Sequence, residues 1–243
     1  VLALMPASAV GGLAHRRVVL GHGMPRGRTA TSLASFLVFA VLVAAGWFGS
    51  RDPLSNPLPL VIWTLMWVGL TLVQGVIGNL WWWVDPWYGP WRLFSRIVGR
   101  REGRRMLNLP SWVGYWPALF LFFAFAWFEL IDPAPDDPAR LATVVAVYYA
   151  ANLVAMLVFG HDAWSRRGEC LSAFFTLISR YAPIGVEGEG GDARAVLRFP
   201  GAGIESEPPL PPSGALFLLL TLASVSFDGL SRTFFWLALN GIN

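Results

Sequence analysis

Five long stretches without any charged side chain constrain most strongly what this chain can fold into. They are Thr29–Ser50, Pro53–Val84, Met106–Phe128, Leu141–Gly160 and Pro208–Phe227. A helix that crosses the hydrocarbon of a bilayer needs about 20 apolar residues, and each stretch supplies them. Only 14% of the residues are charged, against about 25% in soluble domains. The sequence therefore predicts an all-α fold, a polytopic transmembrane helical bundle with about five spans.

We expect the spans at about 30–49, 58–80, 112–131, 139–160 and 213–235, within a single helical membrane domain over residues 1–243. Residues 161–212 then form a surface segment outside the membrane. The chain starts at Val1 and stops at Asn243, directly after an apolar run. We therefore expect it to be a piece of a longer protein.

The arginines predict the orientation of these spans. All eighteen basic residues are Arg. With five spans, fifteen of them fall on alternate segments that share one side of the membrane, and three fall on the other side. Loops rich in Arg stay in the cytoplasm. We expect a multi-pass protein of a bacterial inner membrane, with its Arg-rich segments cytoplasmic.

The stretch 79–105 lies between the second and third spans and combines two interfacial signals. Five Trp lie within residues 81–91, and six Arg lie within residues 92–105. Trp favours the headgroup region and Arg the cytoplasmic side, so we interpret the stretch as a membrane exit that anchors both spans. A Trp-rich core beside a basic turn is the alternative. Any chemistry there would have to run through Asp85 and His161.

The segment after the fourth span shows helical spacing over Ala163–Arg180, with apolar residues on one side. Two interpretations fit: an amphipathic helix lying on the cytoplasmic membrane surface, or a short helix packed against the spans. Ala193–Phe199 alternates polar and apolar residues and predicts one strand of a small hairpin.

Depth in the membrane decides which polar residues can meet, and two groups are possible. The inner group consists of Asn79, Asp85, Asn152, His161, Asp162 and Arg166. The outer group consists of Glu129 and Asp228, with Arg232 and Arg51. Acids inside a membrane are costly and point to function, whereas both outer acids could also be interfacial. Asp228 can pair with Arg232 across one helical turn, and Ser226–Gly229 could interrupt the fifth span.

Metal and cofactor sites have little support in the sequence. His15 and His22 are two helical turns apart, and only His161 with Asp162, joined by Glu169, could complete a site with them at the inner surface. Ordinary interfacial histidines are the favoured interpretation. One cysteine, Cys170, excludes an internal disulfide. No cofactor is expected, and the low net charge of +3 gives nucleic-acid binding no support.

Three local patterns resemble a family of bacterial multi-pass membrane proteins known as fenitrothion-hydrolase-like. They are Ala126–Leu130 followed by Asp136–Pro138, the run Phe159–Pro183, and Ser226–Gly229. Where that family has Asn-Pro-Trp after the second span, this chain has Asp85-Pro86-Trp87. The resemblance implies a polytopic helical protein and hydrolysis of an organophosphate ester. Its patterns coincide with polar residues at Glu129, His161, Arg167, Glu169 and Asp228.

Three functions follow as hypotheses. The favoured one is a non-catalytic accessory or scaffold subunit, which contacts membrane lipids and the transmembrane helices of other subunits. The alternative is a membrane-embedded hydrolase, for which Glu129, Asp228, His161 and Glu169 are the candidate catalytic residues. A small-solute or ion transporter ranks third, because transporters often carry internal repeats and the sequence shows none. The sequence leaves open whether the protein is an enzyme.

Overall fold

The computed structural model describes residues 17–22, 27–99, 105–187, 194–205, 208–239 and 241. Within these residues, five helices are long and apolar enough to cross a membrane. They are α2 (Arg28–Phe48), the continuous helix Pro57–Ile77, the helix Ser111–Ile131, α8 (Pro138–Phe159) and α12 (Pro212–Ser231). The all-α prediction is confirmed, and the chain has the architecture of a multi-pass integral membrane protein.

Two of the spans are composite. The second consists of α3 (Pro57–Pro59), η2 (Leu60–Leu70), which has the wider π-helical turn, and α4 (Thr71–Ile77). The third consists of η3 (Ser111–Val113) and α7 (Trp116–Ile131).

The ends of the spans follow local chemistry. The Asp137 side chain accepts a hydrogen bond from the Arg140 N–H (2.8 Å), and Pro138 follows as the first helical residue, so α8 starts there. Gly160, with φ of 85°, ends the same helix. The last span ends at Ser231, four residues before the predicted 235, and α13 (Phe234–Leu239) follows it. Ser226–Gly229 lies inside continuous α12, so the predicted interruption there is wrong.

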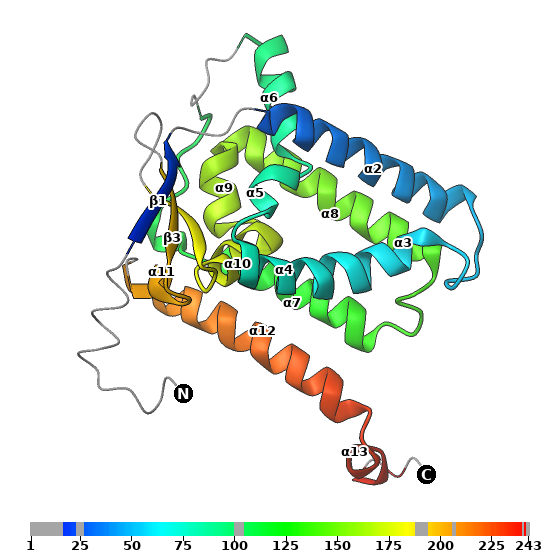
Figure 1. Ribbon diagram of the computed structural model, residues 1–243. Coiled ribbons are helices and arrows are strands. Elements are labelled where there is room, and N and C mark those ends of the chain that lie inside the picture. Colours follow the sequence, from blue (N-terminus) through cyan, green and yellow to red (C-terminus); the bar gives the residue numbers. More distant parts are fainter. Residues whose placement is uncertain are drawn as a thin grey trace, which may run out of the picture.

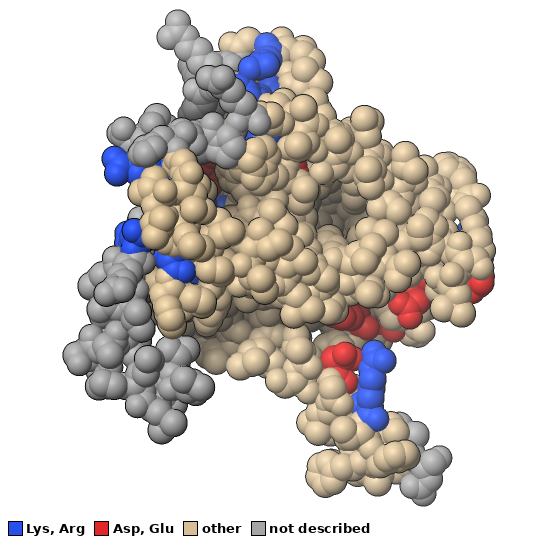
Figure 2. All heavy atoms as spheres, in the orientation of Figure 1, with Lys and Arg blue, Asp and Glu red and all other residues tan. Residues whose placement is uncertain are grey.

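The connections gather at two opposite ends of the bundle, as the alternation of Arg predicted (Figure 1). At one end, Arg51 pairs with Asp137 (3.5 Å) and Arg140 pairs with Asp132 (2.6 Å), which joins the loops before the second and fourth spans. Figure 2 shows Asp and Glu at this end, beside a basic group on the projecting helix, further basic residues at the opposite end, and a mainly uncharged surface between them. We call the two ends the acidic end and the Arg-rich end.

The Arg-rich end carries all the remaining elements except α13. Its helices are α5 (Trp81–Val84), α6 (Tyr88–Ile97), α9 (His161–Arg167), α10 (Cys170–Ser179) and α11 (Ala202–Glu205). A small antiparallel sheet lies beside them, in the order β1 (Arg17–His22), β3 (Arg194–Arg198), β2 (Ile184–Glu187). The predicted strand in 193–199 is therefore present as β3, and β1 adds a strand that the sequence pattern did not reveal.

The segment Ala163–Arg180 forms two helices that meet at Gly168, where an added Cβ would lie 2.4 Å from the Trp164 ring. Eight of the ten residues of α10 are buried. Of the two interpretations of this segment, the burial of α10 favours the short helix packed on the spans over the helix lying on the membrane surface. An apolar helix of this length is too short to cross a bilayer and suits a buried core position.

The Trp-rich stretch enters the core instead of forming only an interfacial belt. Trp81 and Trp87 are buried and belong to the main hydrophobic cluster. The Trp81 Nε1–H donates to Ser172 Oγ (2.8 Å), and the Trp87 Nε1–H donates to the Tyr149 carbonyl (3.0 Å). The indole donors are thereby satisfied inside the protein, and the stretch fastens α5 and α6 to α8 and α10.

Candidate functional site

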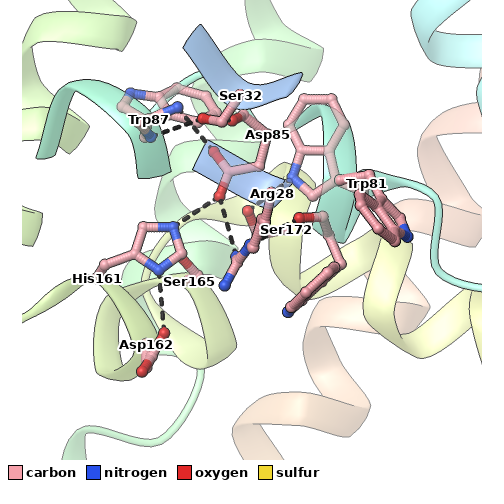
Figure 3. A network of polar contacts seen from close by, with 12 residues as sticks. Arg28, Ser32, Trp81, Asp85, Trp87, His161, Asp162, Ser165 and Ser172 are labelled. Carbon is pink, nitrogen blue, oxygen red and sulfur yellow. Dashed lines mark hydrogen bonds and ion pairs between the residues drawn. The ribbon is translucent and has the colours of Figure 1, made fainter. Parts of the chain in front are cut away.

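A buried polar cluster lies at the Arg-rich end, where three segments distant in sequence meet (Figure 3). Asp85 follows α5, His161 begins α9, and Arg28 begins α2. His161 Nε2 lies 2.6 Å from Asp85 Oδ2, and Arg28 Nη2 lies 3.9 Å from the same oxygen. The other ring nitrogen of His161 lies 3.1 Å from Asp162 Oδ1. The cluster thus joins α2, α5 and α9 through one carboxylate.

The turn that carries Asp85 is fastened to α2 by hydrogen bonds. Asp85 Oδ1 accepts from the Trp87 N–H (2.8 Å). The Ser32 hydroxyl donates to the Asp85 carbonyl (2.5 Å) and accepts from the Gly89 N–H (2.6 Å). A side chain at Gly89 would collide with Leu33, since its Cβ would lie 2.9 Å from the Leu33 nitrogen. Glycine at this position lets α6 approach α2 closely enough to form the cluster.

Aromatic rings cover the Asp85–His161 pair. The rings of Tyr88 and Trp91 lie 5.2 and 5.5 Å from the His161 ring. The Arg28 guanidinium stacks over Tyr88 (3.8 Å) and Trp82 (4.3 Å), a cation–π arrangement. Asp85 and His161 are each 2% exposed. Their charges are therefore compensated mainly by each other and by Arg28.

The protonation of His161 follows from these neighbours. Burial by itself would lower the pKa of His161, but the carboxylates of Asp85 and Asp162 outweigh burial and raise that pKa above its ordinary value. Since both ring nitrogens face carboxylate oxygens, the arrangement favours the doubly protonated imidazole, which can donate to each of them. The hydrogen bond with His161 in turn lowers the pKa of Asp162.

This arrangement limits what the cluster can do chemically. Ser165 Oγ lies 3.3 Å from His161 Nε2, so a hydroxyl, an imidazole and a carboxylate are adjacent, as in nucleophilic hydrolysis. Asp85 lies closer to the same nitrogen, at 2.6 Å. An imidazolium held between two acids has no lone pair to accept the Ser165 proton. The geometry is that of a closed ion-pair network.

Raising the pH is expected to destabilise the protein through His161. The folded state binds this proton more tightly than the unfolded state does. The contribution to stability is therefore full below pH 6.5 and is lost as the pH rises through the raised pKa of His161. Each unit of difference between the two pKa values is worth about 1.4 kcal/mol. Unfolding in detergent, measured from pH 6.5 upward, should show a loss of stability that His161→Gln removes.

The other two histidines supply the control for this measurement. A double variant, His15→Gln with His22→Gln, should keep the pH dependence of the unmodified chain, because His161 and its acids remain. Identical pH profiles for His161→Gln and the unmodified chain would contradict the assignment.

A second buried polar group lies at the start of α10. Both oxygens of Glu169 cap the helix, accepting from the Leu171 N–H (2.9 Å) and the Ser172 N–H (2.6 Å), and the Tyr148 hydroxyl donates to Oε1. Tyr148 also contacts Cys170 Sγ (3.1 Å). Burial raises the pKa of Glu169, and the hydrogen bonds it accepts act in the opposite direction. The contacts of Glu169 bind α8 to α10, and it does not join His161 in one site.

The predicted inner group is brought together only in part. Asp85, His161 and Asp162 meet. Asn152 instead accepts from the Trp164 indole (2.8 Å), Asn79 donates to Thr176 (3.5 Å), and Arg166 is exposed. Sequence reasoning missed Arg28, Ser32, Tyr148 and Ser165. Only Arg28 carried a signal, as the last charge before the first charge-free stretch.

The four residues of the predicted outer group also come together only in part. Arg232 pairs with Asp228 one helical turn away (3.1 Å), as predicted. Glu129 lies on α7 within electrostatic range of both residues. Arg51 instead pairs with Asp137. The acids Glu129 and Asp228 therefore share the acidic end, without a contact of hydrogen-bond length between them.

Among the described residues, those weighed as metal ligands do not form one group. His15 lies outside the described residues, and His22 lies in β1 opposite Arg194 of β3. His161 and Asp162 contact each other in the cluster. Within the described residues there is no group of three His, Cys, Asp or Glu that could hold a metal ion.

Comparisons with protein-family models, with curated proteins and with solved structures find no match to this chain.

Proposed function

We propose that this chain is a non-catalytic accessory subunit of a membrane complex, which packs against the transmembrane helices of a partner protein through α12. In this proposal the Arg-rich end faces the cytoplasm of a bacterial inner membrane. Labelling of an Asp137→Cys variant from the cytoplasmic side would contradict that orientation. The observation that carries the proposal is an exposed stripe along α12.

Five exposed residues of α12 repeat at intervals of four and three. They are Ala215, Leu219, Leu222, Ser226 and Gly229. Such spacing forms one straight seam on a helix, the pattern by which helices pack as coiled coils. Helix contacts in membranes favour small residues, because these let two backbones approach. An added Cβ at Gly229 would meet nothing within 4 Å, so the seam is open at that position. We define these five residues as the α12 stripe.

In the described part of the chain, the opposite side of α12 packs against α7. Phe217 is buried against Phe122 of α7 (ring centroids 5.8 Å apart), and the Tyr115 N–H donates to Ser213 Oγ (3.0 Å). Figure 1 shows α12 projecting away from the rest of the bundle towards α13. A helix that projects in this way leaves room for further helices along its exposed stripe.

Charged side chains at the acidic end also support a protein partner. The Glu129 carboxylate has no hydrogen-bond partner among the described residues. Asp228 and Arg232 lie close by on α12, with side chains 42% and 81% exposed. Polar groups within a membrane are costly unless they are paired. These charged groups lie on the α7 side of α12, away from the stripe, so a polar group of the partner would have to reach that side to complete this site.

Substitutions in the stripe test the proposal. The chain is purified from its native membranes in a mild detergent, and its co-purifying transmembrane proteins are quantified. Ser226→Leu combined with Gly229→Leu should reduce the amount of co-purified partner by about tenfold, because bulky side chains keep the two backbones apart. Ala44→Leu, which adds a bulky side chain to an exposed residue of α2 outside the stripe, should leave co-purification unchanged.

The alternative, a hydrolase of organophosphate esters, has one observation in its favour. Ser165, His161 and Asp162 lie in contact, although Asp85 occupies the ring nitrogen that would have to act as base. The purified chain is therefore also incubated with p-nitrophenyl diethyl phosphate. Release of p-nitrophenol by a monomeric chain, abolished by Ser165→Ala, would defeat the subunit proposal.

A further inference from the structure

A pocket of about 370 Å³ opens at the Arg-rich end, outside the polar cluster. Its walls come from the turn after the second span, the end of α10, the sheet and α11. The second span ends at Ile77, one of the lining residues, so the pocket lies at the level where a membrane meets water. Its volume is within the range of small-ligand sites.

One wall of the pocket is basic. Among the described residues that line it, Arg180 and Arg198 are charged and none is Asp or Glu. The Thr176 hydroxyl accepts from the Asn79 amide (3.5 Å), so its own proton remains to donate. A guanidinium carries five N–H donors in a planar fork, so each Arg can serve more than one acceptor. Planar forks of this kind match phosphate oxygens.

The position of Arg198 is set by two glycines. A Cβ at Gly185 would lie 2.7 Å from Arg198 Cζ, and a Cβ at Gly203 would lie 2.3 Å from its Nη2. The Nε–H of Arg198 donates to the Ala182 carbonyl (3.3 Å). The guanidinium is therefore held between two backbones at a fixed place on the pocket wall. A side chain at either glycine would have to displace it.

The remaining wall is apolar and aromatic. Ile77, Leu80 and Ile184 line it together with Trp82 and Trp83. The Arg28 side chain fixes Trp82, since its Nε–H donates to the Trp82 carbonyl (2.8 Å) and its guanidinium stacks on the ring. A ligand with an anionic group on one side and an apolar group on the other matches these two walls.

We propose that this pocket binds the phosphate-bearing headgroup of an anionic phospholipid. Arg198 and Arg180 contact the phosphate, Thr176 donates a further hydrogen bond, and the tryptophans cover the apolar part of the lipid. Basic pockets at this depth are the kind that holds anionic headgroups. The site is independent of the α12 stripe, so it stands whether or not the chain has a protein partner.

The test uses the purified chain in a neutral detergent and follows quenching of Trp fluorescence by brominated phosphatidylglycerol. Saturable quenching is expected, with at least about tenfold weaker quenching by brominated phosphatidylcholine, because two guanidinium groups favour a net negative headgroup. Arg198→Gln should weaken phosphatidylglycerol binding by about tenfold. Arg194→Gln, in the same strand but outside the pocket lining, should change it less than about twofold.

Two further variants separate a built site from a general attraction to positive charge. Gly185→Ala keeps every charge but displaces the Arg198 guanidinium, and it should also weaken binding severalfold. Thr176→Val removes one donor without touching either Arg, and it keeps the test decisive if Arg198→Gln does not fold. Equal quenching by both lipids, or equal effects of Arg198→Gln and Arg194→Gln, would overturn the proposal. Full competition by glycerol phosphate at the concentration that saturates the lipid would assign the site to a soluble phosphate ester and would also overturn it.

Discussion

Asp85→Ala is expected to lower the free energy of unfolding in detergent by about 3–5 kcal/mol, as when one partner of a buried ion pair is removed. The substitution leaves His161 and Arg28 as buried cations without their shared carboxylate. It also removes the acceptor of the Trp87 N–H. The two cations that shared Asp85 would then repel each other.

The measurement is equilibrium unfolding in mixed micelles, followed by Trp fluorescence. Asp136→Ala is the matched control, because it removes the same side chain from an exposed loop at the acidic end. It should change stability by less than about 0.5 kcal/mol. Asp85→Asn should fall between the two, since the amide oxygen can still accept from the Trp87 N–H. Equal stability of Asp85→Ala and Asp136→Ala would show that the cluster does not hold the bundle together.

Gly46→Leu is expected to destabilise the bundle by about 3 kcal/mol or more, at or above the upper end of overpacking costs. Gly46 lies on α2 where that helix touches α8 and α3. An added Cβ would lie 2.6 Å from Ala142 Cβ, 2.6 Å from Leu58 Cδ2 and 2.8 Å from the Pro138 carbonyl. The Pro138 oxygen is a backbone atom of α8, and the Ala142 Cβ is attached directly to that backbone. Neither atom can move away by rotation of a side chain. The helices would have to separate.

Ala44→Leu distinguishes this collision from the mere addition of bulk. Ala44 is exposed on α2, two residues from Gly46. In a membrane an added Leu there meets lipid, which is as apolar as Leu itself. We expect a change of less than about 0.5 kcal/mol. Equal free energies of unfolding for Gly46→Leu and Ala44→Leu would contradict the close α2–α8 contact.

The spans could be predicted because each depends on its own residues. A charge or an unpaired backbone group in hydrocarbon is costly wherever the rest of the chain lies. Start and stop signals are equally local: Asp137 and Pro138 begin α8, and Gly160 ends it. The last span was predicted too long, since nothing local marks Ser231 as its end. The chain bends there before α13, a turn that apolar composition does not signal.

The candidate site could be predicted only as a set of residues at one depth. Asp85 and His161 were identified as the pair through which chemistry at the Arg-rich end would run, and they lie 2.6 Å apart. The part of Arg28 in the same cluster was not foreseen, because its pairing depends on how α2 is rotated about its axis. Soluble helices reveal their buried face by periodic polarity. Membrane spans are apolar on every side, so this signal is weak.

By itself the sequence determined that the chain is helical, that it has five spans, and which connections share an end, because lipid excludes charge residue by residue. Only the tertiary structure decided that α10 is buried, that Trp81 and Trp87 are core residues, and that α12 stands apart with an exposed stripe. Helices in a membrane gain no hydrophobic energy by choosing one apolar neighbour over another. Their arrangement is decided by close packing, as at Gly46, and by buried polar pairs, as at Asp85, both of which exist only once distant segments have met.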